Sequence, residues 1–280
     1  MTAVRVPASS ANLGAGFDVF GMALTLYADV GCGAPPNGAT VADEHHPAMV
    51  AFRRLGGHGE LWVQSSIPMG RGLGYSGAVR VGGAAAAVLQ RERVLTDTGR
   101  QEILAASADL EHHADNAGAS LFGGVVAAVA EDHEFRVTSL PLGFASMPAV
   151  VAWVPDATTT STDRSRATLP TDVALADAVF NIGRAVTFAA GLAAGDIEAV
   201  RLGTGDRLHQ QWRLARVPES AAALDAALSA GAWSAWLSGS GPTIAALCAQ
   251  GDAGGLAAAL PNTGHTKILG IDPVGVTVID

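Results

Sequence analysis

A glycine-rich segment, Ile67–Ala78, runs directly into an apolar, alanine-rich stretch at Val79–Leu89. If a helix begins near Ser76, its free backbone N–H groups and the positive end of its dipole point back at the glycine turn. Glycines also let the chain pass close to a bound anion. The segment therefore predicts a phosphate-binding loop, although a simple turn before a helix would have a similar composition.

Lysine usage narrows the kind of phosphate site. The only lysine of the chain is Lys267, which lies outside every glycine-rich motif. A Walker-type P-loop needs a lysine beside its Ser or Thr, so this class of nucleotide site is excluded. Chemistry through a lysine Schiff base is disfavoured for the same reason.

The composition bounds the class of protein. With 280 residues, 49% of them hydrophobic, the chain can build a real core and favours two domains. A formal charge of −9 disfavours nucleic acid or an anionic membrane as partner. No signal-peptide pattern or long apolar run is present, so we expect a cytoplasmic protein. Cys32 and Cys248 lack metal-ligand spacing, which predicts buried thiols.

Alternating periodic segments predict an α+β fold in two layers. We expect strands at 4–6, 22–30, 61–66, 149–154, 233–237 and 244–248. We expect helices at 48–55, 76–91, 99–111, 172–194 and 219–230. The strand at 149–154 is expected to close the first half, which gives predicted domains at 1–154 and 155–280.

Two polar segments in the first half are candidate ligand-binding sites. The segment 7–18, expected to be a loop, carries Asn12 and Asp18, whose side-chain acceptors suit an amine or a hydroxyl. The segment 111–118 carries two adjacent histidines, but they point in different directions on a helix and have no i, i+4 partner. A zinc site is therefore disfavoured, and a polar ligand site or a helix C-cap remain as alternatives.

The second half contains three further polar segments. A hydroxyl-rich stretch at 158–165 carries Arg164, with Arg166 just beyond it, and two such arginines can grip a carboxylate or phosphate or simply lie in solvent. A polar cluster follows at 206–213. A second glycine turn lies at 238–243, between two expected strands.

These segments carry a resemblance to a known family. Pro7–Asp18, Gly72–Ala78 and Ser238–Thr243, in this order, are similar to the three motifs of the GHMP kinase superfamily. Within it, His113–Asn116 and Arg166–Pro170 specifically resemble homoserine kinase. The resemblance implies a two-domain fold, with a first half like ribosomal protein S5 domain 2, a ferredoxin-like second half and the active site between them.

The resemblance also implies an activity and a substrate pocket. The resemblance to homoserine kinase implies in-line transfer of the γ-phosphoryl group of ATP to the hydroxyl of L-homoserine, a step of threonine biosynthesis. Asp18 would hold the substrate ammonium, and Arg166 and Arg213 its carboxylate. The implied substrate-binding residues are Asn12, Asp18, His113, Asn116, Thr162, Arg166, Arg213, Gly239 and Ser240. The implied catalytic residues are Asn12, His113, Asp115 and Asn116, with Asp115 as the nearest candidate base.

ATP and Mg²⁺ are the implied cofactors, with Ser76 as a metal ligand. The implied nucleotide-binding residues are Pro68, Gly70, Arg71, Gly72, Leu73, Gly74, Tyr75, Ser76 and Gly77. The sequence departs from the family pattern at four places. Tyr75 replaces a serine, Gly77 replaces an alanine, and His45–Pro47 stands where the family has an asparagine. Ala105 stands where the family has a magnesium-binding glutamate, eight positions before His113.

Two hypotheses follow from these departures. The first is a homoserine kinase whose magnesium is held by substituted ligands. The second is a non-kinase relative that keeps the amino-acid pocket, binds ATP poorly, and acts on or senses homoserine, O-phosphohomoserine or an analogue. In either case we expect a small-molecule amino-acid ligand and a homodimer.

Overall fold

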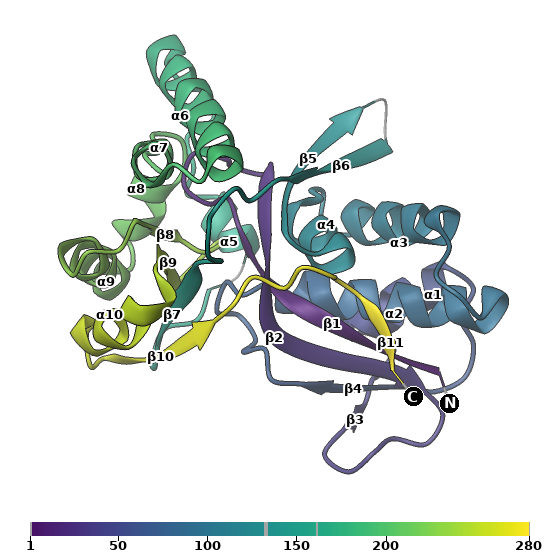
Figure 1. Cartoon of the computed structure of the whole chain (residues 1–280). Coiled ribbons are helices and arrows are strands. Elements are labelled where there is room, and N and C mark those ends of the chain that lie inside the picture. The colour runs from purple at the N-terminus through teal and green to yellow at the C-terminus, as the bar shows by residue number, and fades with distance from the viewer. Residues whose placement is uncertain (1, 132–133, 161, 280) are drawn as a thin grey trace.

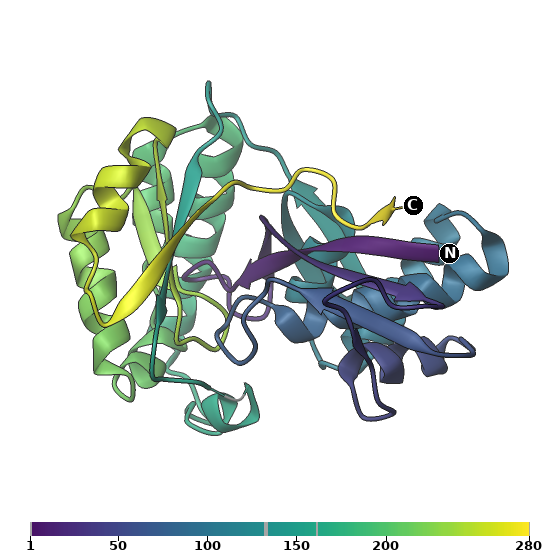
Figure 2. The same cartoon turned by 90° about the horizontal axis from the view of Figure 1, so that it is seen from below.

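The computed structural model describes residues 2–131, 134–160 and 162–279, which form two lobes, each made of helices and an antiparallel sheet (Figures 1 and 2). The first lobe is built on a seven-stranded sheet in the order β11-β1-β2-β4-β3, and β5 and β6 extend it from β2. All of its strand pairs are antiparallel. Its strands are β1 (Thr2–Ala11), β2 (Phe20–Cys32), β3 (Thr40–Val41), β4 (Leu61–Ser65), β5 (Val125–Glu131), β6 (Glu134–Leu140) and β11 (Thr277–Ile279).

Four helices pack with this sheet: α1 (Pro47–Arg54), α2 (Tyr75–Glu92), α3 (Asp97–Asp109) and α4 (Asp115–Phe122). The predicted alanine-rich helix is confirmed as α2, which is buried on nearly every side from Gly77 to Leu89. Alanine favours the helix, and its small side chain lets neighbouring elements approach closely. Helix α3 begins at a conventional cap, because the Thr96 hydroxyl accepts the Gly99 N–H at 3.1 Å.

The second lobe has a four-stranded antiparallel sheet in the order β10-β7-β9-β8. Its strands are β7 (Ala149–Pro155), β8 (Ser234–Leu237), β9 (Ile244–Cys248) and β10 (Gly264–Leu269). The helical elements of this half are α5 (Thr162–Arg166), α6 (Leu175–Ala194), α7 (Ile197–Gly203), α8 (Gln210–Leu214), α9 (Pro218–Ser229), the short 3₁₀ helix η1 (Gln250–Asp252) and α10 (Ala253–Ala259). The predicted two-layer α+β class is confirmed.

Strand β7 does not close the first half as expected. It lies inside the second sheet, between β10 and β9, where all seven of its residues are buried. The C-terminal strand β11 returns to the first sheet and pairs with β1 (Figure 2). A division placed before Ala149 would keep the second sheet in one unit, whereas one after Val154 cuts through it.

The expectation of a loop from residue 7 is wrong for its first five residues. β1 continues to Ala11, paired with β2, and only the segment after it turns back. Small polar residues suggested a loop, yet the hydroxyls of Ser9 and Ser10 are buried and have side-chain partners. Tertiary contacts therefore override the local preference of these residues for turns.

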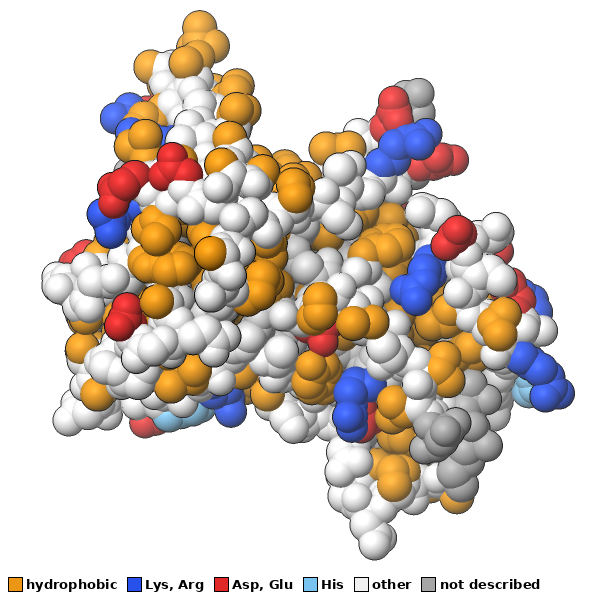
Figure 3. All heavy atoms as spheres, viewed as in Figure 1, with side chains coloured by type: hydrophobic (Ala, Val, Ile, Leu, Met, Phe, Trp, Pro, Cys, Tyr) orange, Lys and Arg blue, Asp and Glu red, His pale blue; other side chains and the backbone are white. Residues whose placement is uncertain are grey.

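One helix of the described residues, α6, is long and apolar enough to cross a membrane by length and composition. This is weak evidence, because core helices of other proteins pass the same test. Figure 3 shows that hydrophobic side chains cover the projecting end of this helix. The exposed hydrophobic residues of α6 include Leu175, Val179, Ile182 and Val186, each more than half exposed.

The contact between α2 and α1 generates a stability prediction. A Cβ atom on Gly83 would lie 1.9 Å from the Ala48 carbonyl oxygen, so Gly83→Ala must push the two helices apart. We expect a loss of about 1–3 kcal/mol in the free energy of unfolding, the usual cost of overpacking. Gly254→Ala in α10 is the control, because a Cβ there meets nothing within 4 Å. It should be neutral or gain about 0.5–1 kcal/mol. Urea unfolding measures both, and equal stabilities of the two variants would contradict this packing account.

Candidate active site

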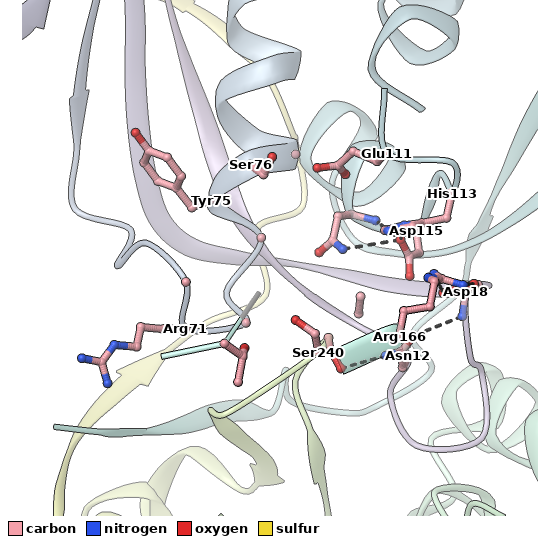
Figure 4. Close-up of a pocket in the computed structure, with 18 of the residues that line it drawn as sticks. Asn12, Asp18, Arg71, Tyr75, Ser76, Glu111, His113, Asp115, Arg166 and Ser240 are labelled. Carbon is pink, nitrogen blue, oxygen red and sulfur yellow. Dashed lines mark hydrogen bonds and ion pairs between the residues drawn. The ribbon is translucent and has the colours of Figure 1, made fainter. Parts of the chain in front are cut away.

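A cavity of about 510 Å³ lies between the two lobes, at the start of α2 (Figure 4). Both glycine turns contribute to its wall, together with the ends of β1 and α3, the start of α4 and the loop before α5. The predicted residues that line it are Asn12, Asp18, Pro68, Gly70, Arg71, Gly72, Gly74, Tyr75, Ser76, Gly77, His113, Asp115, Asn116, Arg166, Arg213, Gly239 and Ser240. The side chain of Thr162 lies outside the described part of the structure.

A chain of hydrogen bonds holds the glycine-rich loop against the second glycine turn. The Trp236 indole N–H donates to the Ser10 hydroxyl at 2.9 Å, which is 2.7 Å from the Ser238 hydroxyl. Ser238 in turn donates to the Gly72 carbonyl at 2.6 Å. Gly72 has a φ of +76°, and a Cβ there would lie 2.3 Å from the Ser238 carbonyl oxygen. Only glycine fits at this position, so the two turns lock together.

Asp18 and Arg166 form an ion pair at one end of the cavity. Two guanidinium nitrogens of Arg166 lie 2.9 and 2.8 Å from the two carboxylate oxygens of Asp18, although the residues are far apart in sequence. The Asn12 side chain supports the turn, since its oxygen accepts the Asp18 N–H at 3.0 Å and its amide donates to the Gly239 carbonyl at 2.9 Å. Asn12 and Asp18 have φ angles of 72° and 57°, a conformation that other contacts must hold in place.

Arg213 lies beside this pair and is almost fully buried. Its guanidinium donates to the Gly239 carbonyl at 3.1 Å, and its Nε atom has no hydrogen-bond partner among the described residues. Burial, partly offset by the charge of Asp18, lowers the pKa of Arg213 to about 10. The guanidinium groups of Arg166 and Arg213 lie 5.4 and 5.3 Å from the Phe17 ring centre. Two cations and one carboxylate thus converge on one end of the cavity, which suits a ligand that carries both charges.

His113 and Asp115 lie beside Asp18, at the start of α4. The His113 Nδ1 atom lies 2.5 Å from an Asp115 carboxylate oxygen, which also accepts the Asn116 N–H at 2.7 Å. Burial alone lowers the pKa of His113, but the hydrogen bond and charge of Asp115, with the charges of Glu111 and Asp18, raise it to about 9. Ligand atoms of Asp18, His113 and Asp115 all lie within 4.8 Å of one another. A protonated imidazole is a poor metal ligand, so this cluster suits a polar or ammonium group better.

Comparisons with known proteins match both lobes. The GHMP kinases N-terminal domain model matches residues 44–124, and the GHMP kinases C-terminal model matches residues 188–266. Homoserine kinase from Moorella thermoacetica is 36% identical over 270 residues, 89% of this chain and 88% of that protein. Homoserine kinase from Thermus thermophilus is 35% identical over 286 residues, 95% of this chain and 94% of that protein.

The chain belongs to the GHMP kinases. Solved structures agree: homoserine kinase from Cytophaga hutchinsonii superposes with a TM-score of 0.83 at 25% identity, over 99% of this chain and 97% of that one. A putative homoserine kinase from Listeria monocytogenes gives a TM-score of 0.78 at 27% identity, over the full length of both chains. L. major mevalonate kinase shares the fold at a TM-score of 0.66 and 15% identity, over 96% of this chain and 95% of that one. The GHMP kinase fold is therefore confirmed.

In this GHMP kinase the sequence prediction missed Glu111. Its carboxylate reaches the cavity beside Ser76, and its Oε2 atom is buried without a hydrogen-bond partner among the described residues (Figure 4). A hydroxyl and a carboxylate oxygen at the start of α2 fit the oxygen ligands that Mg²⁺ prefers. The fixed spacing that led to Ala105 was misleading, because α3 ends at Asp109 and a turn then carries Glu111 to the loop. The signal was present in the polar segment 111–118.

Two predicted nucleotide-binding residues have side chains that make contacts within the protein. The Leu73 side chain is fully buried in the core, and its carbonyl accepts the Ser9 N–H at 3.2 Å. Arg71 lines the cavity, but its guanidinium points away from the polar cluster (Figure 4). It donates to the carbonyls of Thr158 at 2.7 Å and Asp156 at 2.9 Å. Arg71 thus ties the glycine-rich loop to the end of β7 rather than presenting a free charge to a ligand.

Tyr75, the unusual residue of the loop, turns toward α1. Its hydroxyl lies 3.0 Å from His46 Nε2, while His46 Nδ1 accepts the Ala48 N–H at 3.2 Å. Burial lowers the pKa of His46, which favours a neutral ring that donates from Nε2 to Tyr75. Two of the departures from the family pattern, Tyr75 and the histidine segment, therefore contact each other, and the Tyr75 ring points away from Asp115 (Figure 4).

The raised pKa of His113 predicts a pH dependence of stability. A folded-state pKa of about 9, against 6.5 in the unfolded chain, gives stabilisation that is complete below pH 6.5 and is lost as the pH rises through 9. We expect the free energy of unfolding to fall by about 3 kcal/mol across this range. His113→Asn should remove this part of the pH profile. Urea unfolding at several pH values measures it, and parallel profiles for wild type and variant would contradict the assignment.

Proposed function

We propose that this GHMP kinase is a homoserine kinase, which transfers the γ-phosphoryl group of ATP to the hydroxyl of L-homoserine in threonine biosynthesis. The relatives named homoserine kinase support this proposal over most of the chain. The observation that carries it is the cavity itself, in which Asp18, Arg166 and Arg213 lie beside the glycine-rich loop at the start of α2. The cavity thus offers a binding site for a zwitterionic amino acid next to a binding site for the phosphates of the donor.

The charged end of the cavity would bind the amino and carboxylate groups of homoserine. Arg166 and Asp18 neutralise each other in the structure, and a zwitterion presents the same two charges in exchange. The ammonium would lie at Asp18 and the carboxylate at Arg166 and Arg213. Arg213 is suited to this role because it is buried and held from behind by the Gly239 carbonyl, so little reorganisation is needed when the carboxylate arrives.

The hydroxyl of homoserine would then face His113, Asp115 and Asn116. Its oxygen forms a bond to the γ-phosphorus while the bond from this phosphorus to the bridging oxygen of ADP breaks. Asp115 is the nearest candidate acceptor for the hydroxyl proton. His113, with a pKa of about 9, is protonated at neutral pH and would act as a hydrogen-bond donor rather than as the base.

The nucleotide would bind with its phosphates at the glycine-rich loop and the start of α2, where backbone N–H groups favour anions. Ser76 and Glu111 would hold Mg²⁺. When bound, this ion neutralises charge on the phosphate oxygens.

The non-kinase alternative, with poor ATP binding, depended on a missing carboxylate and a misplaced tyrosine ring. Glu111 and the Tyr75–His46 contact remove both reasons, so this alternative is not favoured.

We further propose that the enzyme is cytoplasmic and forms a homodimer. The exposed apolar residues of α6 support a homodimer, because Leu175, Val179, Ile182 and Val186 follow the spacing of a helix–helix seam. A sedimentation experiment that gives the 28.2 kDa mass of one chain would contradict the dimer.

The proposed activity predicts phosphorylation of homoserine by the wild type at about 1–100 s⁻¹ with Mg²⁺ and ATP. Glu111→Gln should lower this rate at least about tenfold and raise the Mg²⁺ concentration for half-maximal activity, because a carboxylate ligand is lost. Glu102→Gln, an exposed glutamate of α3 paired with Arg91, is the control and should change neither. A coupled ADP-release assay measures both values. No turnover of homoserine by wild type would refute the proposed function.

Arg213 generates a second prediction for substrate binding. Arg213→Lys keeps the charge but loses the planar pair of donors, so affinity for homoserine should fall by about 1.5–3 kcal/mol, or about 10- to 100-fold. The effect should appear mainly in KM for homoserine and leave KM for ATP unchanged. Arg216→Lys, an exposed residue just after α8, is the matched control. If Arg213→Lys raised KM for ATP alone, Arg213 would belong to the nucleotide side instead.

A further inference from the structure

Arg80 places a positive charge between the two residues that would hold the metal. It lies one helical turn after Ser76 on α2 and lines the cavity. Its Nη1 atom donates to the Glu111 carboxylate at 2.6 Å and also to the Ser76 hydroxyl. This inference rests on the proposed function, in which Ser76 and Glu111 would hold Mg²⁺. In the structure, the Arg80 guanidinium already contacts both of these oxygen groups.

The environment of this arginine is largely closed. The Arg80 side chain is 20% exposed and that of Glu111 is 8% exposed. The Arg80 Nε atom and the Glu111 Oε2 atom are buried without a hydrogen-bond partner among the described residues. Buried donors and acceptors are costly to leave unpaired, so the contacts within the protein do not fully satisfy this ion pair.

A guanidinium and Mg²⁺ cannot both hold the same two oxygen groups at close range, because like charges repel strongly in a partly buried site. When phosphates enter, the guanidinium has a better partner, since its fork of donors matches phosphate oxygens. We propose that Arg80 contacts the phosphates of ATP directly and supplies part of the charge neutralisation. Nucleotide binding here then depends less on Mg²⁺ than it would with Ser76 and Glu111 alone.

A purely structural role is the competing explanation. In that case Arg80 only fastens α2 to the turn before α4, and its loss would lower stability and weaken ATP with and without metal alike. The two roles differ in one measurable quantity, which is the ratio between the affinities for metal-free ATP and for Mg-ATP.

Calorimetric titration with ATP, in EDTA and in excess Mg²⁺, measures this ratio. We expect Arg80→Gln to weaken metal-free ATP at least about tenfold, the effect of a lost charge-assisted bond, and to change Mg-ATP affinity by less than about threefold. Arg80→Lys should retain most of the metal-free binding because it keeps the charge. Arg91→Gln is the matched control, an exposed arginine of α2 paired with Glu92 and Glu102 outside the cavity, and should change neither affinity.

A second variant protects the test against misfolding of Arg80→Gln. Glu111→Gln leaves Arg80 in place. This variant should therefore bind metal-free ATP as wild type does, but its affinity for ATP should no longer rise when Mg²⁺ is added. The inference is overturned if Arg80→Gln binds metal-free ATP as tightly as wild type, or if both forms of ATP weaken by the same factor. If wild type phosphorylates homoserine in these cases, only the role of Arg80 fails. If wild type binds no ATP in either form, the proposed function fails with it.

Discussion

The locking of the two glycine turns is the contact on which the rest of the site depends. Gly72 packs so closely on Ser238 that no side chain fits between them, and the hydroxyls of Ser10 and Ser238 complete the junction. Because β1 belongs to the first sheet and the second turn joins β8 to β9, this junction sets the position of one lobe against the other. The junction therefore fixes the position of the glycine-rich loop relative to the substrate-binding end of the cavity. Because the loop backbone is already ordered, little conformational entropy is lost when a ligand binds.

Opposite charges are paired inside the cavity, and two of the three pairs join segments that are far apart in the sequence. Asp18 meets Arg166, Arg80 meets Glu111, and His113 meets Asp115. Each pair presents charges that a ligand can replace, namely an ammonium, a carboxylate, a phosphate or a metal. Such pairing keeps a polar cavity stable when it is empty, and it organises the donors before the ligand arrives. Exposed ion pairs elsewhere, such as Arg136–Glu131, contribute little by comparison.

Much of this fold could be predicted from sequence, and the failures have physical reasons. The pattern of apolar residues predicts α2 and β9 correctly, because a continuous apolar run must lie in a buried helix or strand. It missed the end of β1, where buried serines find partners that only the folded chain supplies. Strand β7 was assigned to the wrong half, since apolar runs do not indicate which sheet they join.

The same limit applies to the site. Motifs identified Asp18, His113 and Asp115, because these residue types recur with fixed local spacing. A fixed spacing also led to Ala105. The polar segment 111–118 contains Glu111, but only the structure shows that a turn carries its carboxylate into the cavity. The use of Arg71 as a structural tie was equally invisible, because its carbonyl partners are backbone atoms of a distant segment.

The central claim is that one cavity holds the amino acid at Asp18 and the nucleotide phosphates at the start of α2. A crystal structure with L-homoserine, Mg²⁺ and a non-hydrolysable ATP analogue tests it most directly. We expect the homoserine ammonium at Asp18, its carboxylate at Arg166 and Arg213, and its hydroxyl facing the γ-phosphate beside Asp115. A nucleotide bound away from Ser76 and Glu111, or homoserine bound without contact to Asp18, would contradict the account.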